Sequence, residues 1–321
     1  MGRGENKMTK VCIFGGSGSF GTAMTQLLLR KFDDCEVIIF SRNEKLQFEH
    51  KQKVNSDRVK YIIGDIRDYD AVYKALEDVD YTILASAMKH IDKCESNPDE
   101  CRKTNIDGCI NVINASIERN VKKLVFLSTD KATNPSTIYG CSKLFVEMYC
   151  QCVDNKNTEI IRTRYGNVFG SNGSVVWIFD KLAKEGKKLT VTNPDMTRFF
   201  MSLNQATDLV LNAMLNGKHG DLFVYYNKSC TIEELAKLFS DHYEVIGNRC
   251  EEKTDEALLT INELKHSTMG TGDNIIKVSN IITNLCDFNE PFTSDNAERL
   301  TREELEEMLE DWRKYNETSS S

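Results

Sequence analysis

The sequence contains no apolar run long enough to span a membrane and no stretch that looks like a signal peptide. It also has no excess of positive charge, because 41 lysines and arginines stand against 49 aspartates and glutamates, for a formal net charge of −8. A chain of that charge does not offset a phosphate backbone, which argues against a general nucleic-acid-binding protein. We therefore expect a cytoplasmic protein with neither a nucleic-acid partner nor a membrane partner.

Internal repeats, low-complexity segments and Cys-x-x-Cys pairs are also absent from the sequence. The eleven cysteines are scattered, and several fall within apolar strands or helices, such as Cys12, Cys109 and Cys141. This pattern is typical of buried, reduced thiols rather than of disulfides. Cys94 and Cys101 are not spaced like common zinc ligands, so we predict no metal site.

What the sequence does have is a dense set of reactive side chains after one apolar run. The run Leu124–Leu127 predicts a buried strand that ends at Ser128–Lys131, and ligands bind at this end of the strands in open α/β sheets. Pro135 then breaks the chain before a helix that places Tyr139 and Lys143 on one face. A free phenol titrates near pH ~10, and a neighbouring ammonium lowers that pKa. Tyr139 paired with Lys143 is therefore a candidate proton acceptor for an alcohol undergoing oxidation.

A glycine-rich loop near the start of the chain strengthens this interpretation, since Tyr-x-x-x-Lys alone is a weak signal. An apolar strand over Val11–Phe14 leads into Gly-Gly-Ser-Gly-Ser-Phe-Gly at 15–21 and then into a helix. Dinucleotide sites need glycine at the tight turn, at the pyrophosphate and where helix meets strand, and the helix amino end attracts phosphate. The predicted cofactor-binding residues of this loop are Gly15, Ser17, Gly18, Ser19, Phe20 and Gly21.

The residues after the second strand, Glu36–Phe40, indicate which dinucleotide binds. NAD sites usually carry an acidic residue there, which holds the ribose 2′-hydroxyl, but this chain has Ser41 and Arg42. Arg42 can form two bonds to a 2′-phosphate and Ser41 can add a third. We therefore predict NADP as the cofactor, with Arg42 as a plain surface residue as the alternative.

Two further strands end in candidate cofactor contacts. After Val59–Gly64, Asp65 would either cap the next helix or bind the adenine amine. After Tyr81–Ser86, small residues suit a backbone that lies against a cofactor, and a helix is predicted at 98–119. The candidates from these elements are Asp65, Ile66, Ala85, Ala87, Lys89 and Asn105. Strand–helix alternation over the first ~150 residues predicts an α/β fold with a Rossmann-type doubly wound parallel sheet.

These motifs resemble those of the extended short-chain dehydrogenase/reductases. The matching stretches include Phe-Ser-Arg-Asn-Glu-Lys at 40–45, Ile-Gly-Asp-Ile-Arg-Asp at 63–68, Ser-Thr-Asp-Lys-Ala at 128–132 and Asn-Pro-Asp-Met-Thr-Arg-Phe-Phe at 193–200. Together with Arg-Tyr-Gly-Asn-Val at 164–168, they look like the UDP-N-acetylglucosamine 4,6-dehydratases of surface-polysaccharide biosynthesis, and most like the inverting branch, also described as 4,6-dehydratase/5-epimerase. The resemblance covers roughly residues 10–310, but Cys250-Glu251 departs from the Arg-x-Gly-Glu-Lys pattern of the family.

The resemblance implies a domain organisation and a substrate. Residues 9–165 would form the NADP-binding Rossmann domain, and 166–316 mainly a smaller α/β nucleotide-sugar lobe with a C-terminal helix, with mobile tails at 1–8 and 317–321. UDP-N-acetylglucosamine would be the substrate of a homo-oligomer between dimer and hexamer. Arg198 is the first candidate for the diphosphate, because guanidinium groups bind phosphate in pairs of bonds. The implied substrate-binding residues are Lys89, Asn167, Val175, Thr190, Arg198, Arg249 and Glu252.

The resemblance also implies roles for the reactive set. Tyr139 would take the C4 hydroxyl proton with help from Lys143, which also holds the ribose, while Thr129 hydrogen-bonds the C4 oxygen. Oxidation at C4 acidifies the C5 hydrogen, so that Lys131 can remove it while Asp130 protonates the departing C6 hydroxyl. We expect desolvation or a nearby cation to keep the Lys131 amine partly neutral.

The expected product is UDP-2-acetamido-2,6-dideoxy-L-arabino-hex-4-ulose, formed by a lyase that also inverts C5. The alternatives are a retaining dehydratase, a nucleotide-sugar epimerase or reductase, and a non-catalytic NADP-sensing protein. Without the resemblance, Asp130 and Lys131 could equally form a surface ion pair after a strand.

Overall fold

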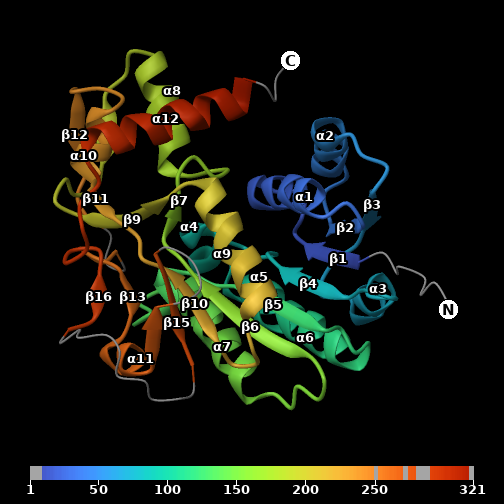
Figure 1. Cartoon of the computed structure of the whole chain (residues 1–321). Coiled ribbons are helices and arrows are strands. Elements are labelled where there is room, and N and C mark those ends of the chain that lie inside the picture. The colour runs from blue at the N-terminus through green and yellow to red at the C-terminus, as the bar shows by residue number, and fades with distance from the viewer. Residues whose placement is uncertain (1–8, 249–251, 270–273, 280–289, 318–321) are drawn as a thin grey trace, which may run out of the picture.

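The computed structural model describes residues 9–248, 252–269, 274–279 and 290–317. Within them, a nine-stranded sheet has the order β14-β15-β10-β6-β5-β4-β1-β2-β3 (Figure 1). Strands β1 to β6 and β10 are parallel, whereas β15 is antiparallel to its neighbours β10 and β14. The predicted parallel sheet is therefore confirmed, with two antiparallel strands added at one edge. Its strands are β1 Thr9–Phe14, β2 Cys35–Ser41, β3 Val59–Ile63, β4 Tyr81–Leu84, β5 Lys123–Leu127, β6 Glu159–Arg164, β10 Leu222–Tyr225, β14 Ser267–Met269 and β15 Ile275–Val278.

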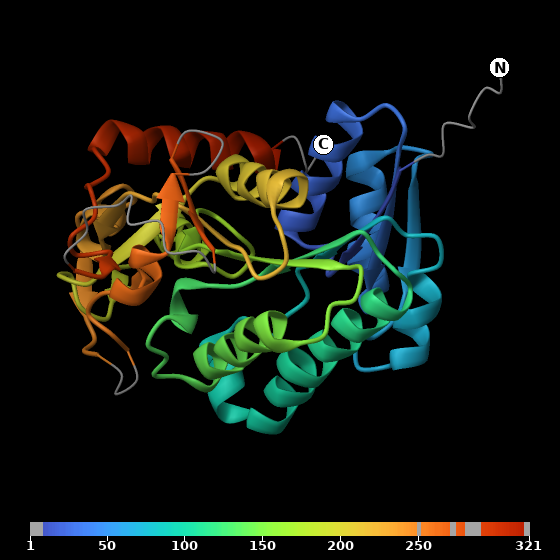
Figure 2. The same cartoon turned by 60° about the horizontal axis from the view of Figure 1, so that its bottom comes forward.

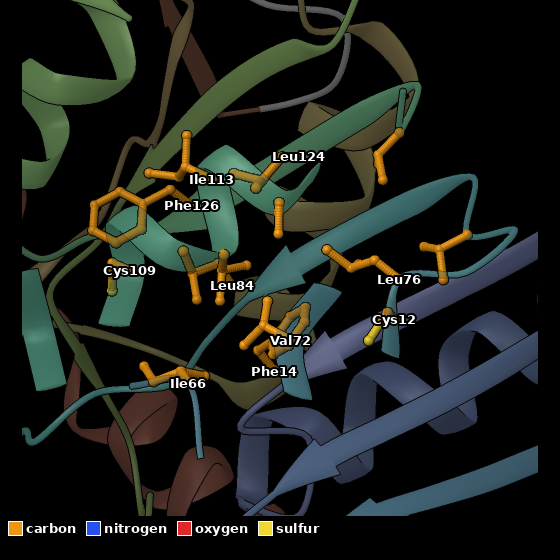
Figure 3. Close-up of a cluster of buried hydrophobic side chains, with 14 of the residues drawn as sticks. Cys12, Phe14, Ile66, Val72, Leu76, Leu84, Cys109, Ile113, Leu124 and Phe126 are labelled. Carbon is orange, nitrogen blue, oxygen red and sulfur yellow. The ribbon is translucent and has the colours of Figure 1, made fainter. Parts of the chain in front are cut away.

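Both faces of this sheet are apolar and both are covered by helices. Successive side chains of a strand point to opposite faces, so Phe14 packs in one cluster with α3, α6 and α7, while Ile13 packs in another with α1 and α9. Figure 3 shows the first cluster, in which Val72 and Ile113 face the sheet. Figure 2 shows α6 and α7 on one side of the sheet and α9 on the other. The helices of these two layers are α1 Ser19–Lys31, α2 Glu44–Val54, α3 Tyr69–Ala75, α6 Cys109–Glu118, α7 Ile138–Cys152 and α9 Leu203–Asn216.

A smaller lobe follows the carboxyl end of β6 and has its own core. Phe169, Val176, Phe200 and Trp312 are among the buried residues of that core. The chain returns to the large sheet through α9, β10, β14 and β15, so the two lobes are interwoven (Figure 1). The elements of this lobe are β7 Asn167–Val168, α8 Val175–Lys184, β8 Leu189–Val191, β9 Thr197–Met201, β11 Ser229–Thr231, α10 Ile232–Lys237, β12 Tyr243–Val245, β13 Ala257–Leu259, α11 Ile261–Lys265, β16 Phe292–Thr293 and α12 Arg302–Glu317.

Some helix boundaries differ from the predicted ones. The predicted helix 98–119 is three pieces, α5 Pro98–Arg102, a π-helical turn Lys103–Gly108, and α6, with the short α4 Ile91–Ser96 before them. Asp65 does not cap the helix after β3, because Asp68 accepts the hydrogen bond from the N–H of Ala71.

The cysteines that the structure describes are all free thiols. Cys12 and Cys109 are buried as expected, but Cys141 lies on the exposed face of α7, so its predicted burial is wrong. In the described part of the chain, no helix combines the length and the apolar character needed to cross a bilayer. Of the predicted tails, 1–8 and 317–321, residues 1–8 and 318–321 lie outside the described residues, whereas Glu317 is the last residue of α12.

Candidate active site

The reactive residues after β5 form a tight, buried turn. A 3₁₀ turn at Asp130–Ala132 follows the strand, and the N–H of Asp130 donates to the carbonyl of Tyr165, 3.1 Å away. The hydroxyl of Thr129 donates to Oδ1 of Asp130 at 2.9 Å, and Nζ of Lys131 donates to the same oxygen at 3.0 Å. Oδ2 of Asp130 is buried and has no hydrogen-bond partner among the described residues. A buried carboxylate with one unsatisfied oxygen is costly unless a further group binds there, so this oxygen is suited to a substrate hydroxyl.

Helix α7 is anchored so that Tyr139 sits beside this turn. The hydroxyl of Thr137 accepts from the N–H of Gly140 at 3.0 Å, and the carboxylate of Glu95 accepts from the N–H of Ile138 at 2.7 Å. A Cβ at Gly140 would lie 2.3 Å from the carbonyl oxygen of Lys131. Only glycine therefore lets the helix approach the turn this closely.

The ionisation of Tyr139 differs from the prediction. Burial and the charge of Asp130 raise the pKa of the Tyr139 phenol above its ordinary value, and only the hydrogen bond with Thr129 opposes them. Nζ of Lys143 instead donates to the carbonyl of Leu127 at 2.8 Å, and burial lowers the pKa of this amine. The predicted lowering of the Tyr139 pKa by Lys143 is therefore wrong for this arrangement, although both side chains lie on the same buried face of α7.

The amine of Lys131 is held in its charged form, contrary to the prediction. Its Nζ lies 3.0 Å from Asp130 and 3.7 Å from Oε1 of Glu256. Burial alone would lower the pKa of Lys131, but the two carboxylates outweigh it and raise that pKa above its ordinary value. Glu256 was missed in the sequence because it stands far along the chain from Lys131, and no spacing rule links the two residues.

A cavity of about 280 Å³ lies between the lobes and brings several predicted residues together. Lys131, Asn167, Arg198 and Glu252 all line it. The cavity is also lined by residues that were not predicted from the sequence, namely Ile91, Asp92, Glu95, Ser136, Thr137, Lys253 and Glu256. Most of these belong to loops and to α4, where neither periodicity nor a motif marks them.

At the wall of this cavity, the guanidinium of Arg198 donates hydrogen bonds to backbone carbonyls. Its Nη1 donates to the carbonyls of Thr197 and Thr254, at 2.7 and 3.0 Å, and its Nη2 donates to the carbonyl of Lys253 at 2.8 Å. The guanidinium thus fixes the segment that carries Glu252 and Glu256 into the cavity. A contact between Arg198 and a diphosphate stays a prediction.

The other predicted substrate residues lie elsewhere or outside the description. Val175 begins α8, Thr190 is exposed in β8, and Lys89 is exposed after β4. Arg249 lies outside the described residues. The cavity therefore brings together only part of the predicted substrate set.

The glycine loop has the shape of a dinucleotide cradle. Gly15 has φ +80°, and a Cβ there would lie 2.8 Å from the backbone N of Ser86. A Cβ at Gly21 would lie 2.1 Å from the carbonyl oxygen of Gly16, so the start of α1 packs directly on the loop. At Gly18 a Cβ would meet only ordinary contacts, at 3.7 Å, which leaves room on this side of the loop. The loop therefore fits a pyrophosphate at the amino end of α1.

The predicted 2′-phosphate residues gather beside this loop. The hydroxyls of Ser17 and Ser41 are hydrogen-bonded at 2.9 Å, and the guanidinium of Arg42 lies 3.6 Å from Asp65. Arg67 also pairs with Asp65 at 2.6 Å, and together the two arginines lower the pKa of that carboxyl against the effect of burial. Four of the predicted cofactor residues thus share one corner of the sheet edge.

Asn105 and Ile66 are buried and support the cradle from behind. The amide of Asn105 accepts from the N–H of Met88 at 2.7 Å and donates to its carbonyl at 2.9 Å, so it clamps the loop after β4. Ile66 belongs to the core beneath the sheet. Asn105 therefore fixes the backbone of the loop that carries Ala87 and Lys89.

A loop from the smaller lobe closes over the glycine loop. The N–H of Asn172 donates to the hydroxyl of Ser19 at 3.3 Å. The indoles of Trp177 and Trp312 both donate to the carbonyl of Gly170, at 2.9 and 3.1 Å, which fixes this loop to α8 and α12. The two lobes are therefore connected across the predicted pyrophosphate site.

Comparison with known proteins places this site in context. The family described as polysaccharide biosynthesis protein matches residues 11–278. A UDP-N-acetylglucosamine 4,6-dehydratase (inverting) of Campylobacter jejuni subsp. jejuni serotype O:23/36 (strain 81-176) is 42% identical over 260 residues, which cover 79% of this chain and 78% of that protein. A UDP-glucose 4-epimerase of Rickettsia conorii (strain ATCC VR-613 / Malish 7) is 38% identical, and the match covers 92% of this chain and 94% of that protein. The X-ray structure of Pen from Bacillus thuringiensis superimposes with a TM-score of 0.88 at 33% identity and covers 95% of this chain and 98% of that one.

Proposed function

The chain belongs to the polysaccharide biosynthesis protein family, and we propose that it is a UDP-N-acetylglucosamine 4,6-dehydratase that inverts C5 of the sugar. Its product would be UDP-2-acetamido-2,6-dideoxy-L-arabino-hex-4-ulose, a precursor for surface glycans, with NADP as the cofactor. The named relatives leave two candidate reactions, because one is an inverting dehydratase and another is a 4-epimerase.

The Asp130–Lys131 pair favours the dehydratase reaction over the epimerase reaction. A 4-epimerase interconverts an alcohol and a ketone at one carbon, for which one proton acceptor such as Tyr139 is sufficient. Elimination across C5 and C6 needs in addition a base for the C5 proton and an acid for the C6 hydroxyl. A buried carboxylate and an amine 3.0 Å apart, with the amine lining the cavity between the lobes, supply this second pair.

The residues of the sheet edge have separable roles in this proposal. Tyr139 takes the C4 hydroxyl proton and Thr129 hydrogen-bonds the C4 oxygen, since the two side chains already interact. The glycine loop, Ser41 and Arg42 would hold the cofactor. When bound, a nicotinamide cofactor supplies the reversible hydride exchange that makes the overall dehydration redox-neutral.

The Lys131–Asp130 ion pair contains the one proton that the elimination needs. Transfer of this proton over 3.0 Å gives a neutral amine and a carboxylic acid. Lys131 then accepts the C5 proton, Asp130 gives its proton to the C6 oxygen, and water leaves. The ion pair is restored by the same step. With the hydride that a bound nicotinamide cofactor would return to C6, a proton from solvent added to the opposite face of C5 would give the L-configured sugar.

Purified protein is expected to turn over UDP-N-acetylglucosamine without added cofactor. An enzyme that regenerates its cofactor in every cycle has no need to exchange it, and the Asn172–Ser19 bond ties the smaller lobe across the cradle. The measurement is product formed per NADP present, by chromatography of the sugar nucleotides. One NADP consumed per product would contradict the dehydratase and favour a simple dehydrogenase.

Arg42→Ala is expected to weaken NADP binding about 10- to 100-fold and to leave NAD binding nearly unchanged. The lost charge-assisted bond to phosphate contributes about 1.5–3 kcal/mol. Titration of both cofactors by fluorescence measures the ratio. Arg67→Ala is the matched control, because Arg67 also forms an ion pair with Asp65, while the other end of its guanidinium pairs with Glu100. Equal losses for both cofactors in Arg42→Ala would remove Arg42 from 2′-phosphate recognition.

A further inference from the structure

A second carboxylate, from the smaller lobe, lies close to the amine of Lys131. Glu256 directly precedes β13, and its side chain is 6% exposed. Its Oε1 lies 3.7 Å from Nζ of Lys131, and its Oε2 lies 3.2 Å from Nζ of Lys253. Lys253 in turn donates to the carbonyl of Thr133, just past the catalytic turn, at 3.2 Å. One buried carboxylate thus lies between the proposed base and a second cation.

This position is built into the fold. The N–H of Glu256 donates to the hydroxyl of Ser294 at 2.9 Å, and the N–H of Ser294 donates back to the carbonyl of Glu256 at 2.7 Å. The hydroxyl of Ser294 is also hydrogen-bonded to that of Thr197 at 2.7 Å. Arg198 holds the carbonyls of residues 253 and 254, as described above. A backbone fixed at several points leaves the Glu256 carboxylate little freedom to move away from Lys131.

We propose that Glu256 is a positioning residue of the elimination step, which holds the Lys131 amine at the cavity wall and sets the pH above which the Asp130–Lys131 pair carries the single proton that the elimination needs. This inference rests on the proposed dehydration. When Asp130 is protonated, it no longer attracts the amine, and Glu256 remains as the negative charge beside it. As the C5 proton reaches Lys131, an ammonium forms next to a carboxylate that is already in place, which is the arrangement that stabilises developing charge.

The charges around Lys131 set the direction of the expected effects. Asp130 and Glu256 favour the ammonium, and Arg198 opposes it. Lys253 offsets part of the Glu256 charge through its own ion pair. Among the described residues, Asp92, Glu95 and Glu252 also line the same cavity. Removing the Glu256 charge should therefore let the pair reach its one-proton form at lower pH, and removing Lys253 should have the opposite effect.

The test is the pH profile of deuterium incorporation at C5 and of product formation in D₂O. Glu256→Gln keeps the size of the side chain, and its elimination rate should extend to lower pH. At a pH on the acid limb of the wild-type profile, the variant should keep a several-fold larger fraction of its own plateau rate, while that plateau falls. Lys253→Met should move the acid limb to higher pH. The C4 oxidation, followed by nicotinamide absorbance, should not shift in either variant.

Three other outcomes bear on this proposal. Acid limbs that coincide with the wild-type limb in both variants would overturn the role of Glu256. If Glu256→Gln does not fold, as judged by thermal unfolding, the direction of the shift in Lys253→Met decides alone. Wild-type protein that forms no product at all would instead contradict the proposed function.

Discussion

Lys131→Met is expected to stop formation of the 4-keto-6-deoxy sugar while leaving oxidation at C4 possible. Methionine keeps the length and bulk of the side chain, but it removes the amine that faces the cavity. Loss of a positioned base typically costs about 10²–10⁴-fold in rate. With substrate, the variant should show the absorbance of reduced nicotinamide and little product.

Tyr139→Phe is the matched control for this result, because it removes the proton acceptor for the earlier step. It should show neither reduced nicotinamide nor product. If Lys131→Met formed the keto sugar at near wild-type rate, another group would be the base, and the Asp130–Lys131 pair would lose its assigned role.

Glu147→Gln is expected to destabilise the protein by about 3–5 kcal/mol, the usual cost of breaking a buried ion pair. Glu147 on α7 is 1% exposed and forms two hydrogen bonds with Arg164 of β6. Arg164 also pairs with Glu263 of α11 at 3.0 Å, and Arg162 lies 3.9 Å from Glu147. The variant would leave two buried guanidiniums with too little negative charge.

Urea unfolding measures this loss, and Glu263→Gln serves as its control. The Glu263 side chain is 25% exposed, so water replaces part of the lost interaction and the destabilisation should be smaller. A Glu147→Gln variant as stable as wild type would mean that the network adds nothing to the fold. Because α7 also carries Tyr139, loss of the network should lower activity as well.

The parts of the site that could be predicted from the sequence have local signals. The glycines at 15–21 stand between a strand and a helix, and parallel strands end at a common edge, so Ser17, Ser41 and Asp65 could be expected to meet. The turn at Asp130 and the helix with Tyr139 follow one another directly in the chain. In each case, the residues that act together are separated by a known element whose geometry is fixed.

The rest depends on contacts that sequence spacing does not encode. Glu256 reaches Lys131 through the fold of the smaller lobe, and its charge adds to that of Asp130 in reversing the expected state of the Lys131 amine. The π-helical turn that points Asn105 at Met88 has no distinctive residue pattern. The helix after β3 begins at Tyr69, so Asp68 rather than the predicted Asp65 stands at its cap position, and Asp65 pairs with Arg67 instead.

The most direct test of the account is NMR of the product that wild-type protein forms from UDP-N-acetylglucosamine in D₂O. The account predicts a 4-keto-6-deoxy sugar of the L-arabino configuration with deuterium at C5, because the proton removed by Lys131 exchanges with solvent before its replacement. A C4 epimer that keeps hydrogen at C5 would contradict it and assign the site to a 4-epimerase. A D-configured 4-keto sugar would retain the dehydration but contradict the inversion.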